Sequence, residues 1–356
     1  MATIKDKKIM TKTILITGGC GFIGTNAAKH YIKKNYKVIS FDNLSRPGAK
    51  QNLSWLKKQG GNFIFEKGDI RNDKKLLEIF KKYKPNLVLH LAAQVTMVTS
   101  VKNPKEDFEI NALGTFNVLE AMRKTKSKAA ALYSSTNKVM GELLYLPVIE
   151  KEKRYIYKNI DGIDESFPLD FHGPYGCSKG CGDQYFIDYS RIFGLNTIVF
   201  RQSGIYGPHQ FGIEEQGWLA WFCNALLFDK PVTIFGTGKQ VRDVLYVDDV
   251  IRAYDLAFKN IKKTKGKAYN IGGGKNFSLS LWELFEIFKK ITGKNFNYKF
   301  GPWRAGDQKV YISNINKAKK DFDWFPTISP KEGVKKLYDW INQNKNIIEK
   351  AGVFKK

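Results

Sequence analysis

A tyrosine and a lysine, Tyr175 and Lys179, stand four residues apart in the segment HGPYGCSKGCGDQYF (172–186). Four residues make about one turn of a helix, so the two side chains would share one helix face. A tyrosine phenol, with a pKa of about 10, is a poor base at neutral pH. A lysine ammonium one turn away stabilises the phenolate and lowers this pKa, so the pair could take a proton from a hydroxyl group. The same spacing also occurs on solvated helices, and the neighbouring sequence must distinguish these interpretations.

A glycine-rich turn is the second feature with chemical meaning. Gly18, Gly21 and Gly24 follow the apolar segment 12–19 and open a predicted helix at 22–35. Glycine lets the backbone turn tightly and approach a diphosphate, and the N-terminal end of a helix attracts phosphate groups. The pattern therefore favours a dinucleotide site over a glycine-rich turn in a protein that binds no nucleotide.

An acidic residue, Asp42, ends the next predicted strand (36–43), 18 residues after Gly24. A carboxylate at this place accepts hydrogen bonds from both ribose hydroxyls and repels a 2′-phosphate. The sequence therefore predicts NAD rather than NADP, although the nearby Arg46 leaves a 2′-phosphate as an alternative.

Two later strand ends fit the same site. Asp69 ends the predicted strand 62–70, where its carboxylate could accept from the adenine amino group, and LAAQ (91–94) ends the predicted strand 86–93. Small residues at a strand end let a cofactor lie against the backbone. Each feature alone also fits ordinary packing at a strand end.

The composition excludes several classes of protein. The 356 residues are 43% hydrophobic, which is enough to bury a large core. No apolar run is long enough to cross a bilayer, and the segment 1–12 lacks the hydrophobic stretch of a secretory signal. We therefore expect a cytoplasmic protein that does not bind membranes.

The formal net charge of +25 raises the question of nucleic acid. Only nine of the 59 basic residues are arginines, and the lysines are spread along predicted helix faces. Because arginine is the preferred residue for phosphate and base recognition, this charge indicates solubility and attraction of anionic small molecules rather than nucleic-acid binding. The four cysteines form no CxxC pair and the four histidines are scattered, so we expect reduced thiols and no metal site.

Apolar segments alternate with amphipathic ones up to about residue 205. Strands are predicted at 12–19, 36–43, 62–70, 86–93, 129–136 and 196–203, and helices at 22–35, 73–83, 104–125 and 175–193. This alternation indicates a parallel sheet with helices on both faces. The segment 247–273 returns to a helix and a strand, whereas the residues between Asn137 and His172 form a long polar insertion that is functional or mobile.

The predicted fold is α/β, a Rossmann-like doubly wound parallel sheet with a smaller C-terminal α/β substrate-binding lobe. We assign the NAD-binding domain to 11–205 plus 245–273, and the substrate-binding lobe to 206–244 plus 274–350. Residues 1–10 form a basic N-terminal extension.

The chain resembles the extended short-chain dehydrogenase/reductases that act on nucleotide sugars. The resemblance covers about residues 11–345 and rests on TGGCGFIG, FDN, GDI, HLAA, YSSTNKVMGE, PYGCSKG, QVRDVLYVDDV and RAGD. Within this family it is most similar to the CDP-paratose (CDP-tyvelose) 2-epimerases, through SSTNKV, LDFHGPYGCSKG, DYSRIFGLNTIVFR and QGWLAWF. It departs from many relatives at Met140, where they have tyrosine, and at Gly204, where they have asparagine.

The resemblance implies an isomerase that holds NAD, with Tyr175 as base, Lys179 as its activator and ribose ligand, and Thr136 as the third catalytic residue. The C2–H of a pyranoside is not acidic, so epimerisation would proceed through a transient 2-keto sugar and hydride return to the opposite face. The predicted cofactor contacts are Gly18, Gly21, Phe22, Ile23, Gly24, Asp42, Asn43, Ser45, Arg46, Asp69, Ile70, Leu91, Ala92, Ala93, Gln94, Ser134, Tyr175, Lys179 and Gln202.

The expected partner is a nucleoside diphosphate sugar, preferably a CDP-hexose, in lipopolysaccharide O-antigen biosynthesis. The predicted substrate contacts are Thr136, Asn137, His172, Tyr175, Gln216, Trp218, Arg242, Arg304 and Asp307. The resemblance also implies a homodimer or homotetramer, with the helices 104–125 and 175–193 as candidate contacts.

Three alternatives remain. A UDP-sugar 4-epimerase shares the same core machinery. A 4,6-dehydratase is disfavoured, because it would need an acid pair where Asn137 and Lys138 follow Thr136. A protein of another class, an NAD-binding regulator without turnover, typically lacks the tyrosine or the lysine, and both are present here.

Overall fold

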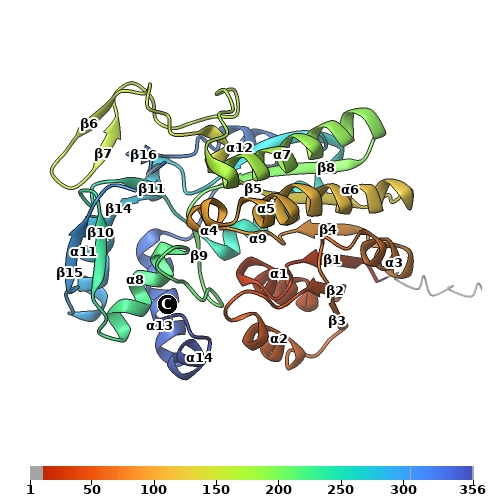
Figure 1. The fold of residues 1–356 in the computed structure, drawn as a ribbon, viewed down its shortest axis with the longest axis horizontal. Helices are drawn as coiled ribbons and strands as arrows, with labels where there is room; N and C mark the ends of the chain where they lie inside the picture. Colours follow the sequence, from red (N-terminus) through yellow and green to blue (C-terminus); the bar gives the residue numbers. More distant parts are fainter. Residues whose placement is uncertain (1–10, 305, 355–356) are drawn as a thin grey trace, which may run out of the picture.

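A seven-stranded parallel sheet forms the centre of the computed structural model, which describes residues 11–304 and 306–354 (Figure 1). The predicted basic extension at 1–10 lies outside the described residues. In spatial order the strands are β13 (Lys267–Ile271), β8 (Asn196–Gln202), β5 (Ala130–Thr136), β4 (Leu87–His90), β1 (Thr13–Thr17), β2 (Lys37–Asp42) and β3 (Phe63–Lys67). This order reverses direction between β1 and β4, which is where doubly wound sheets bind their ligands.

Helices cover both faces of this sheet, as the alternating pattern predicts. One face packs on α1 (Phe22–Lys33) and α9 (Val247–Lys259), and the other packs on α3 (Asp73–Tyr83), α6 (Gly114–Lys124) and α7 (Gly173–Phe193). Successive residues of β1 show why: Ile14 and Ile16 belong to the first core, whereas Leu15 belongs to the second. The sequence analysis did not predict α2 (Ala49–Lys57) or α4 (Met97–Lys102).

The predicted helix at 104–125 is continuous but not regular. It consists of α5 (Pro104–Phe108), a π-helical turn η1 (Glu109–Leu113) and α6. Such turns add one residue to a helix and often occur near functional sites. The Asn111 side chain in this turn donates to the backbone carbonyl of Gln94 and accepts from the backbone N–H of Gln94. It therefore ties the helix to the segment after β4.

The C-terminal half adds small sheets beside the large one. They are built from β9 (Ile205–Tyr206) with β12 (Leu245–Tyr246), β10 (Val232–Phe235) with β15 (Tyr298–Gly301), and β14 (Ser278–Ser280), β11 (Val241–Asp243) and β16 (Val310–Tyr311). The remaining helices of this half are α8 (Trp218–Leu227), α10 (Ile261–Thr264), η3 (Lys275–Phe277), α11 (Leu281–Thr292), α12 (Asn316–Phe322), α13 (Pro330–Gln343) and α14 (Lys345–Lys350). The capping box of Ser280 and Glu283 fixes the start of α11.

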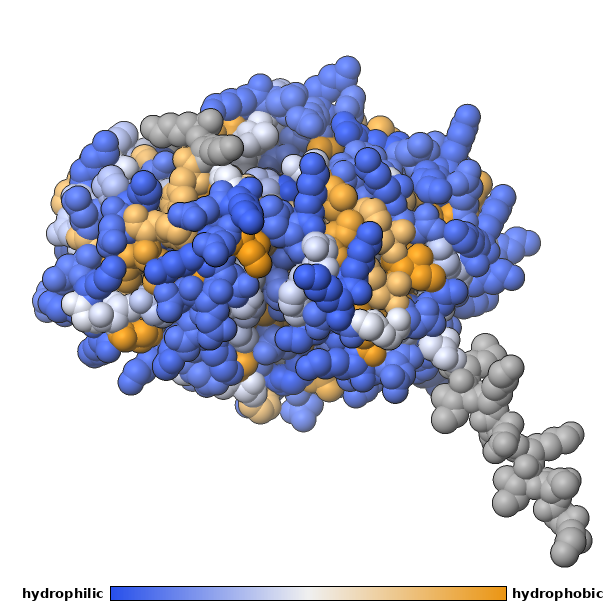
Figure 2. Space-filling view, turned by 90° about the horizontal axis from the view of Figure 1, so that it is seen from below, coloured by the Kyte–Doolittle hydropathy of each residue, from blue (hydrophilic) through white to orange (hydrophobic). Residues whose placement is uncertain are grey.

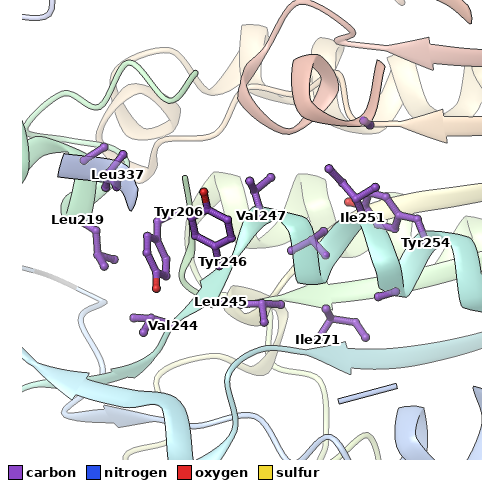
Figure 3. Packing of buried hydrophobic residues seen from close by; sticks show 14 of the residues in the cluster. Tyr206, Leu219, Val244, Leu245, Tyr246, Val247, Ile251, Tyr254, Ile271 and Leu337 are labelled. Carbon is purple, nitrogen blue, oxygen red and sulfur yellow. The ribbon is translucent and has the colours of Figure 1, made fainter. Parts of the chain in front are cut away.

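The two halves share one hydrophobic core. Figure 3 shows Tyr206 and Tyr246 of the small β9–β12 sheet between Leu219 of α8 and the residues of α9. Ile271 of β13, a strand of the large sheet, lies in the same cluster. This continuity fixes the C-terminal sheets relative to the large sheet. The domain boundaries given above stay a prediction.

The segment 137–172 is not the polar loop that the sequence analysis predicts. It begins with η2 (Asn137–Met140) and contains the hairpin β6 (Val148–Glu150) and β7 (Tyr155–Tyr157), at the upper left of Figure 1. Its side chains Val139, Tyr157 and Ile163 are buried against Val241 and Tyr311 of the β11–β16 pair. The apolar residues of this segment are spaced too irregularly to show a period, so the sequence analysis missed their common core.

Hydrophilic residues dominate the face shown in Figure 2, and hydrophobic ones reach the surface there in separate patches. Across the described residues, no helix combines the length and the apolar character needed to span a membrane.

Candidate active site

The glycine turn after β1 leaves no room for side chains. Gly18 has a φ of +67°, and a Cβ atom there would lie 2.7 Å from the backbone nitrogen of Ala92. A Cβ on Gly24 would lie 2.2 Å from the Gly18 carbonyl oxygen. Gly21 is the N-cap of α1 and provides no side-chain cap, so the helix presents bare N–H groups to a diphosphate.

The Asp42 carboxylate is fixed at the end of β2. It accepts hydrogen bonds from the backbone N–H of Cys20 (2.9 Å) and of Leu44 (2.7 Å). Burial raises the pKa of Asp42, and these backbone hydrogen bonds act against the rise. The carboxylate therefore stands ready to accept from ribose hydroxyls, as the sequence predicts.

Asp69 lies beside it, after β3. Its carboxylate accepts from the Arg71 guanidinium (2.8 Å) and from Asn43 (2.9 Å). Partial burial opposes ionisation, but the hydrogen bonds from the Arg71 side chain and backbone outweigh it and lower the pKa of Asp69 to about 2.

One cleft runs past the carboxyl ends of β1, β2, β4 and β5, and we call it the cofactor cavity. Ligands of doubly wound sheets bind at this edge, outside the carboxyl ends of the strands. The predicted contacts that line it are Gly18, Gly21, Phe22, Ile23, Gly24, Asp42, Asn43, Ser45, Arg46, Asp69, Ile70, Leu91, Ala92, Ala93, Ser134, Tyr175 and Lys179. These positions, far apart in the chain, fit the NAD that the sequence predicts.

Two predicted cofactor contacts do not line the cavity. The Gln94 amide donates to the Thr96 carbonyl and to Asp107, which turns it into the loop behind the cavity. The Gln202 amide accepts from Ser134 and donates to Tyr254, beneath the cavity floor. Both side chains support residues of the site.

Tyr175 and Lys179 line the cofactor cavity, whereas Thr136 does not line it and is buried beside Tyr175. Burial raises the pKa of Tyr175 to about 12, while a hydrogen bond with Thr136 and the charge of Arg46 act to lower it. This differs from the sequence prediction, in which Lys179 lowers the pKa of Tyr175. The Lys179 ammonium instead donates to the Ser134 carbonyl (2.6 Å), and burial lowers the pKa of Lys179 to about 7.

Small residues in α7 let this helix lie close to its neighbours. A Cβ on Gly182 would lie 2.5 Å from the Tyr133 hydroxyl oxygen, and a Cβ on Gly180 would meet the Phe171 ring at 2.5 Å. Ser178, one residue before Lys179, donates to Asp107 of α5 (2.5 Å). The glycines and this hydrogen bond explain how the turn of α7 that carries Tyr175 and Lys179 is held against β5.

A buried ion pair supports the end of β5 from below. Arg201 of β8 donates two hydrogen bonds to Asp183 of α7 (2.9 and 3.0 Å), and Ser135 donates to the same carboxylate (2.7 Å). Because Asp183 accepts from both Arg201 and Ser135, it links the strand of Thr136 to the helix of Tyr175. Removal of either charge would leave the other buried and unpaired.

Most predicted substrate contacts gather beyond this end of the cavity. Arg242 of β11 forms an ion pair with Asp307, and the Arg304 guanidinium lies 3.8 Å from the centre of the Phe235 ring. Asn137 donates to Gln308 (3.4 Å), so the segment after Thr136 contacts the loop around 306–308. Residue 305 lies outside the described residues.

Three other predicted substrate contacts lie elsewhere. Trp218 packs on the main hydrophobic core, as aromatic residues at helical spacing commonly do. His172 is half-exposed between Glu142 (3.4 Å) and Asp170 (3.2 Å), at the edge of the site. Gln216 lines the cofactor cavity, where its side-chain oxygen accepts from Arg46 (3.0 Å).

One wall of the cofactor cavity, formed by the loop after β9, was not predicted from the sequence. His209, Gln210 and Phe211 line the cofactor cavity together with Asn52 of α2. His209 has a φ of +65°, and burial lowers its pKa to about 4, so the imidazole is neutral. No glycine pattern or strand end marks these residues; the histidine and aromatic ring in GPHQF were the available signal.

The described residues contain no cluster of three or more histidine, cysteine or acidic residues that could hold a metal ion. The four cysteines are free thiols. Cys177 is exposed, and its thiol lies 3.4 Å from the Phe171 carbonyl oxygen.

Comparisons with known proteins agree with this geometry. The family model described as "NAD dependent epimerase/dehydratase family" matches residues 14–272. A CDP-paratose 2-epimerase of Salmonella typhi is 49% identical over 92% of this chain and 99% of its own length. A putative UDP-glucose 4-epimerase of Methanocaldococcus jannaschii is 36% identical over 93% of this chain and 99% of its own length.

Solved structures show the same similarity. The UDP-glucose 4-epimerase of Thermotoga maritima, solved with UDP-glucose, has a TM-score of 0.80 and 34% identity, covering 94% of this chain and 99% of that one. The UDP-glucuronic acid 4-epimerase of Bacillus cereus, solved with UDP-glucuronic acid and NAD, has a TM-score of 0.80 and 29% identity, covering 93% and 99%.

Proposed function

The chain belongs to the NAD dependent epimerase/dehydratase family, and from this premise we propose that it is a CDP-paratose/CDP-tyvelose 2-epimerase. It is an isomerase, and its cofactor is NAD. The observation that supports the substrate most strongly is the 49% identity to the Salmonella typhi CDP-paratose 2-epimerase over nearly the full length of both chains.

The lining of the cavity supports one orientation for NAD. The N-terminal end of α1 would hold the diphosphate, the Asp42 carboxylate would hold the adenosine ribose, and Tyr175 with Lys179 would face the nicotinamide. When bound, NAD supplies a reversible acceptor for hydride. The chain itself must then move one proton and present both faces of the sugar ring.

The Tyr175 phenolate takes the proton from the sugar 2-hydroxyl as C2 becomes a ketone, and returns it after the ring has turned over. Thr136 donates a hydrogen bond to the same oxygen. Lys179 provides the positive charge that stabilises the phenolate once its ammonium leaves the Ser134 carbonyl. Arg242 and Arg304 hold the substrate diphosphate, with Asp307 on the nucleotide ribose, because a planar guanidinium matches diphosphate oxygens.

The test uses substrates labelled with deuterium at C2 or at C4. With CDP-paratose or CDP-tyvelose, we expect inversion at C2 with the C2 deuterium kept, because the hydride is removed and returned without exchange with water. NMR of the products reads both the position and the label. Inversion at C4 only, or no turnover with any CDP-hexose, would contradict the proposal.

A UDP-sugar 4-epimerase is the second candidate, since the Methanocaldococcus and Thermotoga relatives carry that name. The same assay with UDP-glucose separates the two. Thermal stabilisation by CDP well above that by UDP would favour the 2-epimerase. An NAD-binding regulator without turnover would bind NAD and convert none of these sugars.

We further propose a homodimer formed by the helices of the NAD-binding half. Large apolar side chains are exposed along α5, η1, α6 and α7, and these are Phe108, Leu113, Phe116, Tyr185, Ile192 and Phe193. The Phe116 and Tyr185 rings lie 5.8 Å apart, and clusters of exposed large apolar side chains mark protein–protein interfaces. Analytical ultracentrifugation should show a dimer that Phe116→Asp dissociates, whereas a monomeric parent protein would refute it.

We also propose the cellular location of the enzyme and the boundaries of its two domains. We place the enzyme in the cytoplasm and its product in lipopolysaccharide O-antigen synthesis, which fits the name of the Salmonella relative. We also assign cofactor binding to 11–205 plus 245–273, and sugar-nucleotide binding to 206–244 plus 274–350.

A further inference from the structure

Arg46 and Gln216 bridge the mouth of the cofactor cavity. Arg46 lies in the loop between β2 and α2, and Gln216 lies just before α8, in the other half of the chain. The Arg46 guanidinium donates from Nη2 to Oε1 of Gln216 at 3.0 Å. Both side chains line the same cavity as Tyr175.

The two loops touch at further points. Gly48 has a φ of +80°, and a Cβ there would lie 2.0 Å from the Phe211 ring, so the loops are in direct contact. Asn52 donates to the His209 carbonyl (3.3 Å) and its side-chain oxygen contacts the His209 ring nitrogen (3.1 Å). The bridge therefore belongs to an organised contact between the loops rather than to one surface side chain.

The charge of Arg46 is not compensated by a neighbouring carboxylate. Within 11–304 and 306–354, no acidic group lies at ion-pair distance from it, and Gln216 is its one side-chain acceptor. A guanidinium has five N–H donors, and a partly buried cation with unused donors is costly unless it faces an anion or a polar ligand. Burial lowers the pKa of Arg46, in keeping with this poor solvation.

The position of Arg46 also bears on whether its guanidinium would bind the 2′-phosphate of NADP. The Asp42 carboxylate is engaged by the backbone at Cys20 and Leu44, whereas Arg46 extends across the cavity to Gln216. The Arg46 guanidinium is thus directed to the loop before α8 and not to the Asp42 carboxylate, which is predicted to bind the ribose. It acts at the mouth of the cavity.

We propose that Arg46 is a positioning residue: anchored on Gln216, it closes the cavity mouth over bound NAD and keeps a positive charge opposite Tyr175. The closure depends only on NAD binding, whereas the effect on Tyr175 rests on the proposed function. Retention of NAD between turnovers is a need of this chemistry, because hydride must return to the sugar from which it came.

The other charged groups around Tyr175 do not stabilise its phenolate in this structure. Asp107 of α5 opposes phenolate formation, and the Lys179 ammonium donates to the Ser134 carbonyl. Asp183, behind Lys179, is paired with Arg201. Arg46 is the cation that lowers the pKa of Tyr175, against the larger effect of burial.

The first experiment measures NAD release from the purified holoenzyme after dilution, in the parent, Arg46→Gln, Arg46→Lys and Gln216→Ala. The matched control is Lys50→Gln, which removes an exposed cation from the next helix. We expect release from Arg46→Gln to be about tenfold faster, Arg46→Lys and Gln216→Ala to be intermediate, and the control to be unchanged.

The second experiment reads the charge at position 175 without any sugar substrate. Tyr175→Cys places a thiol there, and its alkylation rate against pH, followed by peptide mapping, gives the thiol pKa. Combining it with Arg46→Gln should raise that pKa by about one unit, and combining it with Lys50→Gln should not. Circular dichroism confirms that each variant is folded.

Unchanged NAD release and an unchanged thiol pKa in folded Arg46→Gln would overturn the inference. If Arg46→Gln does not fold, the same readings on Arg46→Lys and Gln216→Ala stand in its place. Neither reading needs CDP-hexose turnover, so a failure of the proposed function leaves the closure of the cavity independently measurable.

Discussion

The Lys179 ammonium lies 4.2 Å from the centre of the Tyr133 ring, and Tyr133 is part of the strand that ends at Thr136. The ring face and the Ser134 carbonyl hold the cation in an apolar setting. His90 stacks on Tyr133 from β4 at 5.5 Å, and burial lowers the pKa of His90 to about 3, so no second charge is added. Lys179 is thus a poorly solvated group.

The first prediction concerns stability and pH. Burial lowers the pKa of Lys179 to about 7, whereas an unfolded lysine titrates near 10.4. Between these values the unfolded NAD-free chain binds more protons than the folded chain. Lys179 therefore makes the free energy of unfolding rise with pH from about 7 to 10, and it adds no pH dependence below about pH 7. Chemical denaturation across this range should show a shallower rise for Lys179→Met than for the parent.

The exposed Lys50→Met serves as the control for that slope, because its removal lowers the net charge equally. An identical slope in Lys179→Met and the parent would mean that Lys179 keeps its proton in the folded chain.

The second prediction separates chemistry from cofactor binding. Tyr175→Phe removes the phenol and keeps the ring, so turnover should fall by about 10²–10⁴-fold. NAD content, measured after denaturing the purified protein, should stay close to that of the parent. Thr136→Ser should retain much of the activity and Thr136→Ala little, since the hydroxyl is the group in question. Near-normal turnover of Tyr175→Phe would remove Tyr175 from the role of base.

The third prediction tests the close packing of α7. Gly182→Ala places a methyl group 2.5 Å from the Tyr133 hydroxyl oxygen and should lower the free energy of unfolding by about 1–3 kcal/mol. Tyr133→Phe removes that oxygen, so the double variant should be more stable than the sum of the single changes predicts. Strict additivity in denaturant unfolding would show that the two residues do not compete for space.

The fourth prediction concerns cofactor choice. Asp42→Ala removes the acceptor for the ribose hydroxyls and the repulsion of a 2′-phosphate, so NAD affinity should fall about 10- to 100-fold and NADP discrimination should weaken. Binding titrations with both cofactors give the ratio. Asp42→Asn keeps an oxygen for the backbone N–H groups and isolates the effect of charge. A variant that still rejects NADP as the parent does would place the discrimination elsewhere.

Local patterns predicted the large sheet well. The strands around β1 and β4 are continuous apolar runs, and the Gly18 to Gly24 spacing together with Asp42 fixed which strand ends form the cofactor cavity. Such features depend on neighbours in sequence, so they can be read without a structure. The helices α2 (nine residues) and α4 (six residues) were not predicted, because so few turns do not show a helical period of apolar residues.

Long-range contacts were the part that sequence could not supply. Nothing local shows that Arg46 reaches Gln216, 170 residues later, or that Lys179 turns to Ser134 rather than to Tyr175. In the chain without NAD, burial raises the pKa of Tyr175, and this effect of the fold does not show in the four-residue spacing to Lys179.

The segment 137–172 leaves the large sheet directly after Thr136, joins the β11–β16 pair, and returns directly before Tyr175. Thr136 and Tyr175 thus stand at the two ends of one segment that packs on the C-terminal half of the chain. Evolution could exchange the segment 137–172 alone and so alter which carbon of the substrate meets the cofactor. The glycine turn and α7 would then stay unchanged. A common scaffold with several sugar specificities is a natural outcome of this path of the chain.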